Sequence, residues 1–291
     1  MKKISRLLAI AGATLMSAAA MVAFAGCDTG SPEVTITYEF NGEKYEVEYT
    51  LSRDGAPMTV RHFLELADAG YYDGTVIHNY ESNGLLLYGG GYVLDEDGEL
   101  EEKDYWTEVK RLEEEKGITF TQSVFYDNTT DPLYTVRGEF SANGVEKNNK
   151  SLRQNARGTL VMYYMNKGED STRVSTLRND GKEVQDGDYY RYNSATSLFY
   201  TITSSNNTSG NSDNEYCAFG VVKDYEQLKK LLDAISEYKE GLDENNPFTI
   251  DRDVMLNQHD PFESVSKGGI TATYSIPTEP IIITSVKVNK Y

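Results

Sequence analysis

The sequence predicts a mainly β domain, folded as a closed antiparallel barrel with one α-helix at each mouth. Two observations lead to this prediction. Many short apolar runs are separated by turn residues, and two stretches show helical periodicity with clear end signals. Because short strands bounded by turns are typical of all-β barrels, the two helices are expected to cap the barrel.

The first two strands are predicted from alternating apolar and polar residues. Residues 34–40 and 45–51 alternate in this way, and Asn41-Gly42 lies between them. An Asn-Gly pair between alternating runs is the strongest short-range signal for a β-hairpin. Residues 281–288 are expected to form the last strand.

The first helix is predicted near residues 59–69. Pro57 precedes it, at a position where the missing N–H costs nothing. Gly70 supplies the left-handed residue that ends it. The apolar positions recur at the spacing that buries one helix face, and they are Val60, Phe63, Leu64 and Ala67.

The second helix is predicted near residues 225–238. Asp224 is the expected N-cap and Gln227 follows three residues later. Tyr225, Leu228, Leu232 and Ile235 then occupy one helix face.

Residues 1–26 are expected to be a removed signal peptide. A positively charged start precedes an uncharged apolar run, and Ala25-Gly26 precedes Cys27. This arrangement resembles a bacterial lipoprotein signal, which implies that Cys27 is acylated and anchors the chain through a short linker, residues 27–33. The alternative is an uncleaved membrane helix, because the apolar run is long enough to span a bilayer.

Charge and cysteine content exclude several functions. The net charge of -18 becomes -21 when the three basic residues of the leader are removed. Nucleic acid is therefore not an expected partner, because phosphate binding needs clustered Lys and Arg. Cys217 is the only cysteine besides Cys27, so a Cys-based zinc site is excluded and a buried, inert thiol is expected. We expect neither a metal nor a cofactor.

Six motifs occur in the order in which the bacterial cyclophilins carry them. The segment from Gly55 to His78 is similar to the A-P-x-T-V-x-N-F-x-x-L and G-x-Y-D-G-T-x-F-H-R motifs of this family of peptidyl-prolyl isomerases. The other motifs are Leu85–Gly90, Gly138–Phe140, Arg157–Met162, Asn193–Tyr200 and Ala218–Val222. The resemblance implies a cyclophilin barrel over residues 34–291, with insertions near residues 92–134, 166–192 and 239–268.

The resemblance also implies where the site lies. Prolyl isomerisation requires an apolar proline pocket and electrostatic stabilisation of a twisted amide, whose barrier is ~18–20 kcal/mol. Asn79 stands at the family's arginine position and Tyr88 at its glutamine position, so both are catalytic candidates. The candidates for substrate binding are Leu85, Leu86, Met162, Tyr163, Tyr200 and Tyr216. For Met162 a role in the core is an equal alternative, and a structural role is expected for His78.

Replacing arginine by Asn79 weakens the expected chemistry, because charge-assisted hydrogen bonds are about twice as strong as neutral ones. The chain also has one residue more than the family pattern between His78 and Gly89. We therefore expect a lipid-anchored, extracytoplasmic prolyl isomerase of low activity that assists folding of exported proteins at the bacterial cell membrane. The main alternative is a non-catalytic cyclophilin-like protein that binds peptides or proteins. A solute-binding lipoprotein is disfavoured because two α/β lobes are lacking.

We predict that the precursor is cleaved before Cys27 and acylated on that cysteine, because the apolar run ends in small residues followed by cysteine. Mass spectrometry of the membrane fraction checks this, and a lipid-bearing peptide beginning at Cys27 is expected. Recovery of an intact segment 1–27, or of unmodified protein in the medium, contradicts it.

Overall fold

The computed structural model describes residues 30–81, 83–126, 132–146, 152, 156–163, 174–177, 183–185, 194–204, 216–255 and 271–291. The predicted signal peptide and Cys27 lie outside the described residues. One compact unit runs from Ser31 to Lys290.

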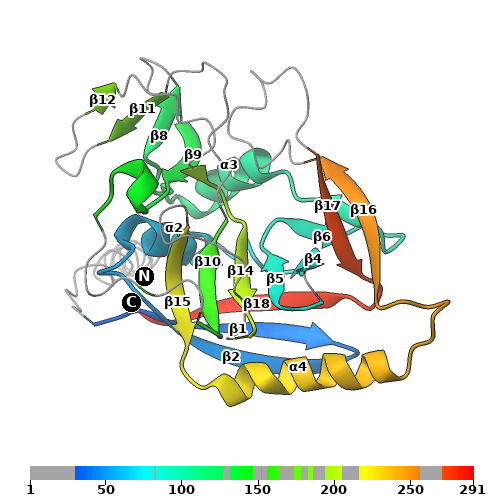
Figure 1. Cartoon of the computed structure of the whole chain (residues 1–291). Helices are drawn as coiled ribbons and strands as arrows, with labels where there is room; N and C mark the ends of the chain where they lie inside the picture. Colours follow the sequence, from blue (N-terminus) through cyan, green and yellow to red (C-terminus); the bar gives the residue numbers. More distant parts are fainter. Residues whose placement is uncertain are drawn as a thin grey trace, which may run out of the picture. The chain divides into compact units, whose positions relative to one another are not determined.

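A strongly curled sheet of nine antiparallel strands dominates this unit (Figure 1). The prediction of a mainly β, antiparallel fold is confirmed. The strands, in their order across the sheet, are β3 (Thr75–Val76), β18 (Ile281–Lys290), β1 (Glu33–Phe40), β2 (Glu43–Leu51), β15 (Cys217–Val222), β10 (Thr159–Met162), β14 (Phe199–Ile202), β5 (Leu86–Gly89) and β4 (Asn79–Glu81).

The prediction of a closed barrel was wrong, because the sheet is an open half-barrel. Its edge strands β3 and β4 do not pair with each other. They are consecutive in the chain, and the two residues between them face different partners. The N–H of Ile77 donates to the carbonyl of Ile281 (2.8 Å), whereas the N–H of His78 donates to that of Tyr88 (3.0 Å). The chain therefore passes from edge strand β3 to edge strand β4 within two residues. This connection is too short for the two edge strands to pair with each other.

The β1–β2 hairpin forms as predicted. Asn41 and Gly42 join the strands with φ angles of 49° and 79°. Positive φ at both central residues is the turn geometry whose twist matches that of two antiparallel strands. The predicted last strand is also confirmed, as β18, and it pairs with β1.

Three helices are present among the described residues, namely the two predicted ones and one in a stretch that was expected to be inserted. The two predicted helices are α2 (Pro57–Asp68) and α4 (Tyr225–Glu240), and the third is α3 (Tyr105–Lys116). α3 begins after Asp104, whose side chain accepts a hydrogen bond from the N–H of Thr107, and ends at Gly117, where φ is 64°. It lies in the inserted stretch 92–134.

The N-terminus of α2 is capped from a distant part of the chain. Ala56 precedes the helix and offers no side-chain acceptor. Instead, the carboxylate of Glu139 accepts hydrogen bonds from the N–H groups of Met58 (3.1 Å) and Thr59 (2.8 Å). A carboxylate satisfies the first N–H groups of a helix and interacts favourably with its dipole. At α4, Asp224 caps as predicted, but Gln227 accepts a hydrogen bond from the N–H of Glu48 (2.8 Å).

Smaller sheets carry the remaining strands. β6 (Tyr92–Leu94) pairs with β7 (Leu100–Glu102), and β16 (Thr249–Met255) pairs with β17 (Thr271–Pro277). A five-stranded sheet has the order β12 (Glu183–Gln185), β11 (Val174–Leu177), β8 (Val124–Tyr126), β9 (Pro132–Arg137) and β13 (Ser194–Ala195). A single 3₁₀ turn, η1, spans Ser141–Asn143. The stretches expected to be inserted contain β6, β7, β8, β11, β12 and β16, whereas β17 begins after the third stretch, at Thr271.

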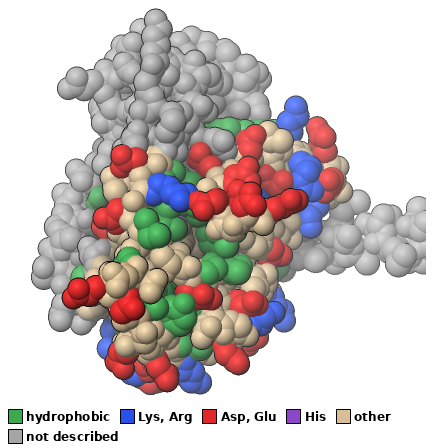
Figure 2. Space-filling model, turned by 90° about the vertical axis from the view of Figure 1, so that its right-hand side faces the viewer, with side chains coloured by type: hydrophobic (Ala, Val, Ile, Leu, Met, Phe, Trp, Pro, Cys, Tyr) green, Lys and Arg blue, Asp and Glu red, His purple; other side chains and the backbone are tan. Residues whose placement is uncertain are grey.

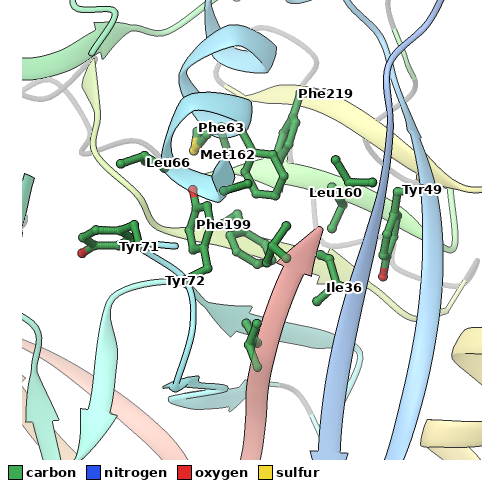
Figure 3. Close-up of a cluster of buried hydrophobic side chains, with 14 of the residues drawn as sticks. Ile36, Tyr49, Phe63, Leu66, Tyr71, Tyr72, Leu160, Met162, Phe199 and Phe219 are labelled. Carbon is green, nitrogen blue, oxygen red and sulfur yellow. The ribbon is translucent and has the colours of Figure 1, made fainter. Parts of the chain in front are cut away.

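Aromatic side chains fill the core between α2 and the sheet (Figure 3). The four predicted apolar positions of α2 are buried. The ring of Phe63 lies 5.0 Å from the rings of Tyr72 and Phe219, centroid to centroid, and 5.6 Å from the ring of Phe199. Cys217 is a buried free cysteine, as predicted, and its sulfur lies 3.6 Å from the hydroxyl of Thr59.

We predict that Phe63→Ala lowers the free energy of unfolding by about 3–5 kcal/mol, because the ring is buried among three other aromatic rings. Chemical denaturation of the two proteins measures the difference. Ile118→Ala is the control, because Ile118 is 37% exposed, and it should cost less than about 1 kcal/mol. A loss for Phe63→Ala as small as that of the control would refute the packing.

Candidate functional site

Side-chain alternation gives the sheet a second apolar face, opposite the core. Along β14, Phe199 points into the core and Tyr200 to the other face. Along β10, Met162 likewise points into the core and Val161 to the other face. We call the second set the outer-face cluster. Its buried members are Leu86, Val161, Tyr200, Ile202 and Ala218, and its partly buried members are Tyr88, Leu152 and Tyr216.

Four tyrosines form a row on this face, which we call the tyrosine row. From one end to the other they are Tyr216, Tyr200, Tyr88 and Tyr163. The ring centroids of Tyr216 and Tyr200 are 6.5 Å apart, those of Tyr200 and Tyr88 4.9 Å, and those of Tyr88 and Tyr163 5.9 Å. Tyr200 is buried, whereas the other three are partly exposed. Rings in such edge-to-face and tilted contacts stabilise one another and leave apolar faces available to a ligand.

The sequence assigns seven side chains to substrate binding or to the glutamine position, and the structure brings five of them together on this face. They are Leu86, Tyr88, Tyr163, Tyr200 and Tyr216. The remaining two candidates lie elsewhere. Met162 is buried in the core beside Phe63 and Phe199, which agrees with the alternative that its role is structural (Figure 3). Leu85 is half-buried, and its carbonyl accepts a hydrogen bond from the N–H of Thr203 (3.1 Å).

Asn79 lies directly opposite Tyr88 in the β4–β5 register. The turn between the two strands contains Asn83 and Gly84, with φ angles of 59° and 84°. The strand register places Asn79 and Tyr88 side by side.

The side chain of Asn79 is buried and already has two partners. Its Oδ1 accepts a hydrogen bond from the backbone N–H of Ser275 (2.9 Å), and its Nδ2 donates to a carboxylate oxygen of Glu81 (3.4 Å). Ser275 belongs to β17. The amide at the arginine position thus joins the barrel edge to an additional hairpin.

The electrostatics of the site are dominated by burial and by a carboxylate. Burial raises the pKa of Tyr88 far above its ordinary value, and the nearby negative charge of Glu81 raises it further. Burial also raises the pKa values of Tyr163 and Tyr274, and smaller contributions in the same direction come first from a neighbouring tyrosine, Tyr216 and Tyr163 respectively, and then from carboxylates that include Glu81. These hydroxyls therefore stay neutral at physiological pH and can donate hydrogen bonds.

Sequence reasoning missed three residues of this region, namely Tyr92, Tyr274 and Glu81. The ring of His78 lies 4.4 Å from that of Tyr92 and 5.0 Å from that of Tyr274, centroid to centroid. Tyr92 comes from β6 and Tyr274 from β17, so both additional hairpins reach the strand end that carries Asn79. The position of Tyr92 directly after three glycines was the one local signal for it.

Across the described residues, no three His, Cys, Asp or Glu side chains gather in a way that could hold a metal ion. None of the helices in the described ranges has the length and hydropathy needed to cross a membrane.

Comparisons with known proteins agree with these features. The family model described as cyclophilin type peptidyl-prolyl cis-trans isomerase/CLD matches residues 35–175. The peptidyl-prolyl cis-trans isomerase cyp18 of Streptomyces antibioticus is 27% identical over 138 residues, which are 46% of this chain and 79% of that protein.

Two crystal structures of a Cryptosporidium parvum cyclophilin-type isomerase, one with the dipeptide Ala-Pro, also match. They are 16% and 15% identical, with TM-scores of 0.39 and 0.40. The matches cover 90% and 89% of this chain and 99% of each of those chains.

We predict that Asn79→Ala loosens β17, because the partly buried N–H of Ser275 loses its acceptor. Hydrogen–deuterium exchange of the peptide covering residues 271–277 should become faster, and the free energy of unfolding should fall by about 1–3 kcal/mol. Asn289→Ala is the matched control, because Asn289 donates an exposed hydrogen bond to Thr35 (2.6 Å). Unchanged exchange in β17 would show that Asn79 does not anchor it.

Proposed function

We propose, from the chain's similarity to the cyclophilin-type peptidyl-prolyl isomerases, that it is a weakly active prolyl isomerase which assists folding of exported proteins. The observation that carries this proposal is the pairing of Asn79 with Tyr88 at the edge of the outer-face cluster. This arrangement keeps the apolar part of a prolyl site and changes its electrostatic part.

The tyrosine row supports binding of a proline-containing segment. Proline is apolar and its preceding carbonyl accepts hydrogen bonds. Tyr88, Tyr163 and Tyr216 are partly exposed and combine an apolar ring with a hydroxyl donor. A proline ring packed on these faces would place its amide next to neutral donors.

The low activity follows from the partners of Asn79. A neutral amide lacks the charge that stabilises a twisted prolyl amide, and its Oδ1 is occupied by the N–H of Ser275. Losing one donor directed at the transition state typically costs ~10²–10³ in rate. Replacing Asn79 by arginine is not a clean test, because it also removes the acceptor from Ser275.

Tyr88 is the best candidate for a substitute donor. Its hydroxyl remains protonated because burial and Glu81 raise its pKa. It lies opposite Asn79 and its ring is partly exposed, so it faces the place where the amide would be held.

A non-catalytic peptide-binding role is the second candidate, and one observation favours it. The charged group beside the tyrosines is the carboxylate of Glu81, opposite in sign to the arginine of the family pattern. Negative charge there would oppose the electron shift toward the carbonyl oxygen during twisting, without preventing binding.

The extracytoplasmic, lipid-anchored location is likewise our proposal. It rests on the charged start, apolar run and small residues that precede Cys27. Two acyl chains hold a protein on a membrane stably, at about 0.8 kcal/mol per buried CH₂ group.

We predict that a protease-coupled assay with a prolyl peptide gives a rate about 10²–10³ below that of an ordinary cyclophilin. Tyr88→Phe should lower kcat by a further tenfold or so and leave KM nearly unchanged, because the ring stays and the donor is lost. Tyr45→Phe, on β2, is the control and should retain the original rate.

Two results would contradict this assignment. An ordinary cyclophilin rate would show that the missing arginine is not limiting. Peptide binding without any isomerisation in either protein would favour the non-catalytic role.

A further inference from the structure

A groove lies between the two additional hairpins, β6–β7 and β16–β17. It encloses a volume of about 280 Å³. Its apolar walls come from both hairpins and from the segment that follows β17, and they consist of Leu94, Leu100, Ile250, Ile276, Pro277 and Pro280. Ile250 is 54% exposed, which is unusual for an isoleucine on a short strand.

The groove is continuous with the aromatic residues beside the candidate site. Leu94, Leu100 and Ile276 pack against the same hydrophobic cluster as Tyr92 and Tyr274. Those two tyrosines contact His78, the neighbour of Asn79. A ligand that runs along the groove would therefore approach one end of the candidate site.

The rim of the groove is acidic. The turn of the β6–β7 hairpin, which borders the groove, is the run from Asp95 to Glu99. Asp251 and Asp253 are exposed on β16, where they alternate with the groove-lining Ile250 and Arg252 and therefore lie on the other face of that strand. Arg252 is the basic residue that lines the groove, and Glu99 pairs with it at 2.6 Å. Figure 2 shows acidic side chains gathered beside hydrophobic patches on the face that lies to the right in Figure 1.

The hairpins also offer backbone groups. Within the described ranges, β16 pairs with β17 alone and β7 with β6 alone, so each hairpin has an edge strand outside the main sheet. An edge strand can add an extended peptide by main-chain hydrogen bonds, and side-chain pockets then give specificity.

We propose that this groove binds an extended polypeptide segment of a partner in which lysine or arginine alternates with aliphatic residues. The aliphatic side chains would pack on Ile250 and Ile276, and the alternating basic ones would meet Asp251 and Asp253 on the other face of β16 and the acidic β6–β7 turn. An acidic segment is disfavoured by the same charges. This site is separate from the tyrosine row, and binding to it requires no isomerase activity.

The test is a binding measurement on the full chain in a non-ionic detergent. The probe is a fluorescein-labelled peptide of alternating lysine and valine, and its counterpart has glutamate in place of lysine. We expect saturable anisotropy changes with the lysine peptide, weaker at higher salt, and none with the glutamate peptide.

Variants then locate the binding. Ile250→Ser should weaken it about tenfold, because an exposed aliphatic contact is lost while folding is little affected. Ile118→Ser is the matched control, since Ile118 is the other isoleucine found exposed among the described residues, at 37%, and does not line the groove. It should bind as the original chain does.

Three results would overturn the proposal: equal weakening by both variants, equal binding of both peptides, or no binding of the lysine peptide. Sedimentation of the original chain as a dimer and of Ile250→Ser as a monomer would instead assign the groove to a second copy. Loss of isomerase activity has no bearing on these outcomes, so failure of this proposal and failure of the proposed function are distinguishable.

Discussion

The alternation of side chains along four neighbouring strands determines what the rest of this structure can do. In β5, β14, β10 and β15, alternate residues enter the core under α2, and the others form the outer-face cluster. A shift of one residue in register would exchange the two faces. The pairings Phe199↔Gly89 and Tyr200↔Tyr88 therefore fix both the core position of Phe199 and the place of Tyr200 in the tyrosine row. Core packing and site geometry thus depend on the same ladder of backbone hydrogen bonds.

Asn79 connects this sheet to the additional hairpins. Arginine, with donors only, could not accept the hydrogen bond that Asn79 accepts from the N–H of Ser275. Asn79 therefore anchors β17. Anchoring β17 places Tyr274 on His78 and Ile276 in the wall of the groove. Asn79, which the motif resemblance aligns with the family's arginine, thus serves as an attachment point for an additional hairpin.

The sequence predicted the elements whose signals are local. The β1–β2 turn depends on Asn41-Gly42, and α2 depends on its own apolar spacing and on Gly70, so neighbouring residues suffice.

Contacts between distant residues could not be predicted in this way. The cap that Glu139 gives to α2 joins positions about 80 residues apart, and the contact of Tyr274 with His78 joins positions still farther apart. The open barrel was missed for the same reason. It depends on the bend at residues 77–78, where Ile77 bonds to Ile281 and His78 bonds to Tyr88, so that the two edge strands pair with different neighbours. The motif alignment placed five side chains on one face, since strand alternation carries over with the motif, but it gave no information on the inserted hairpins.

The distribution of charge suggests why a barrel with a weakened site would retain its hairpins. At the tyrosine row, the carboxylate of Glu81 makes the surroundings of Tyr88 negative, which favours a ligand with basic residues. The rim of the groove carries the same sign of charge, and the aromatic residues between the two sites form one packed unit. Both surfaces therefore carry the charge that complements a basic ligand, although each is a separate site.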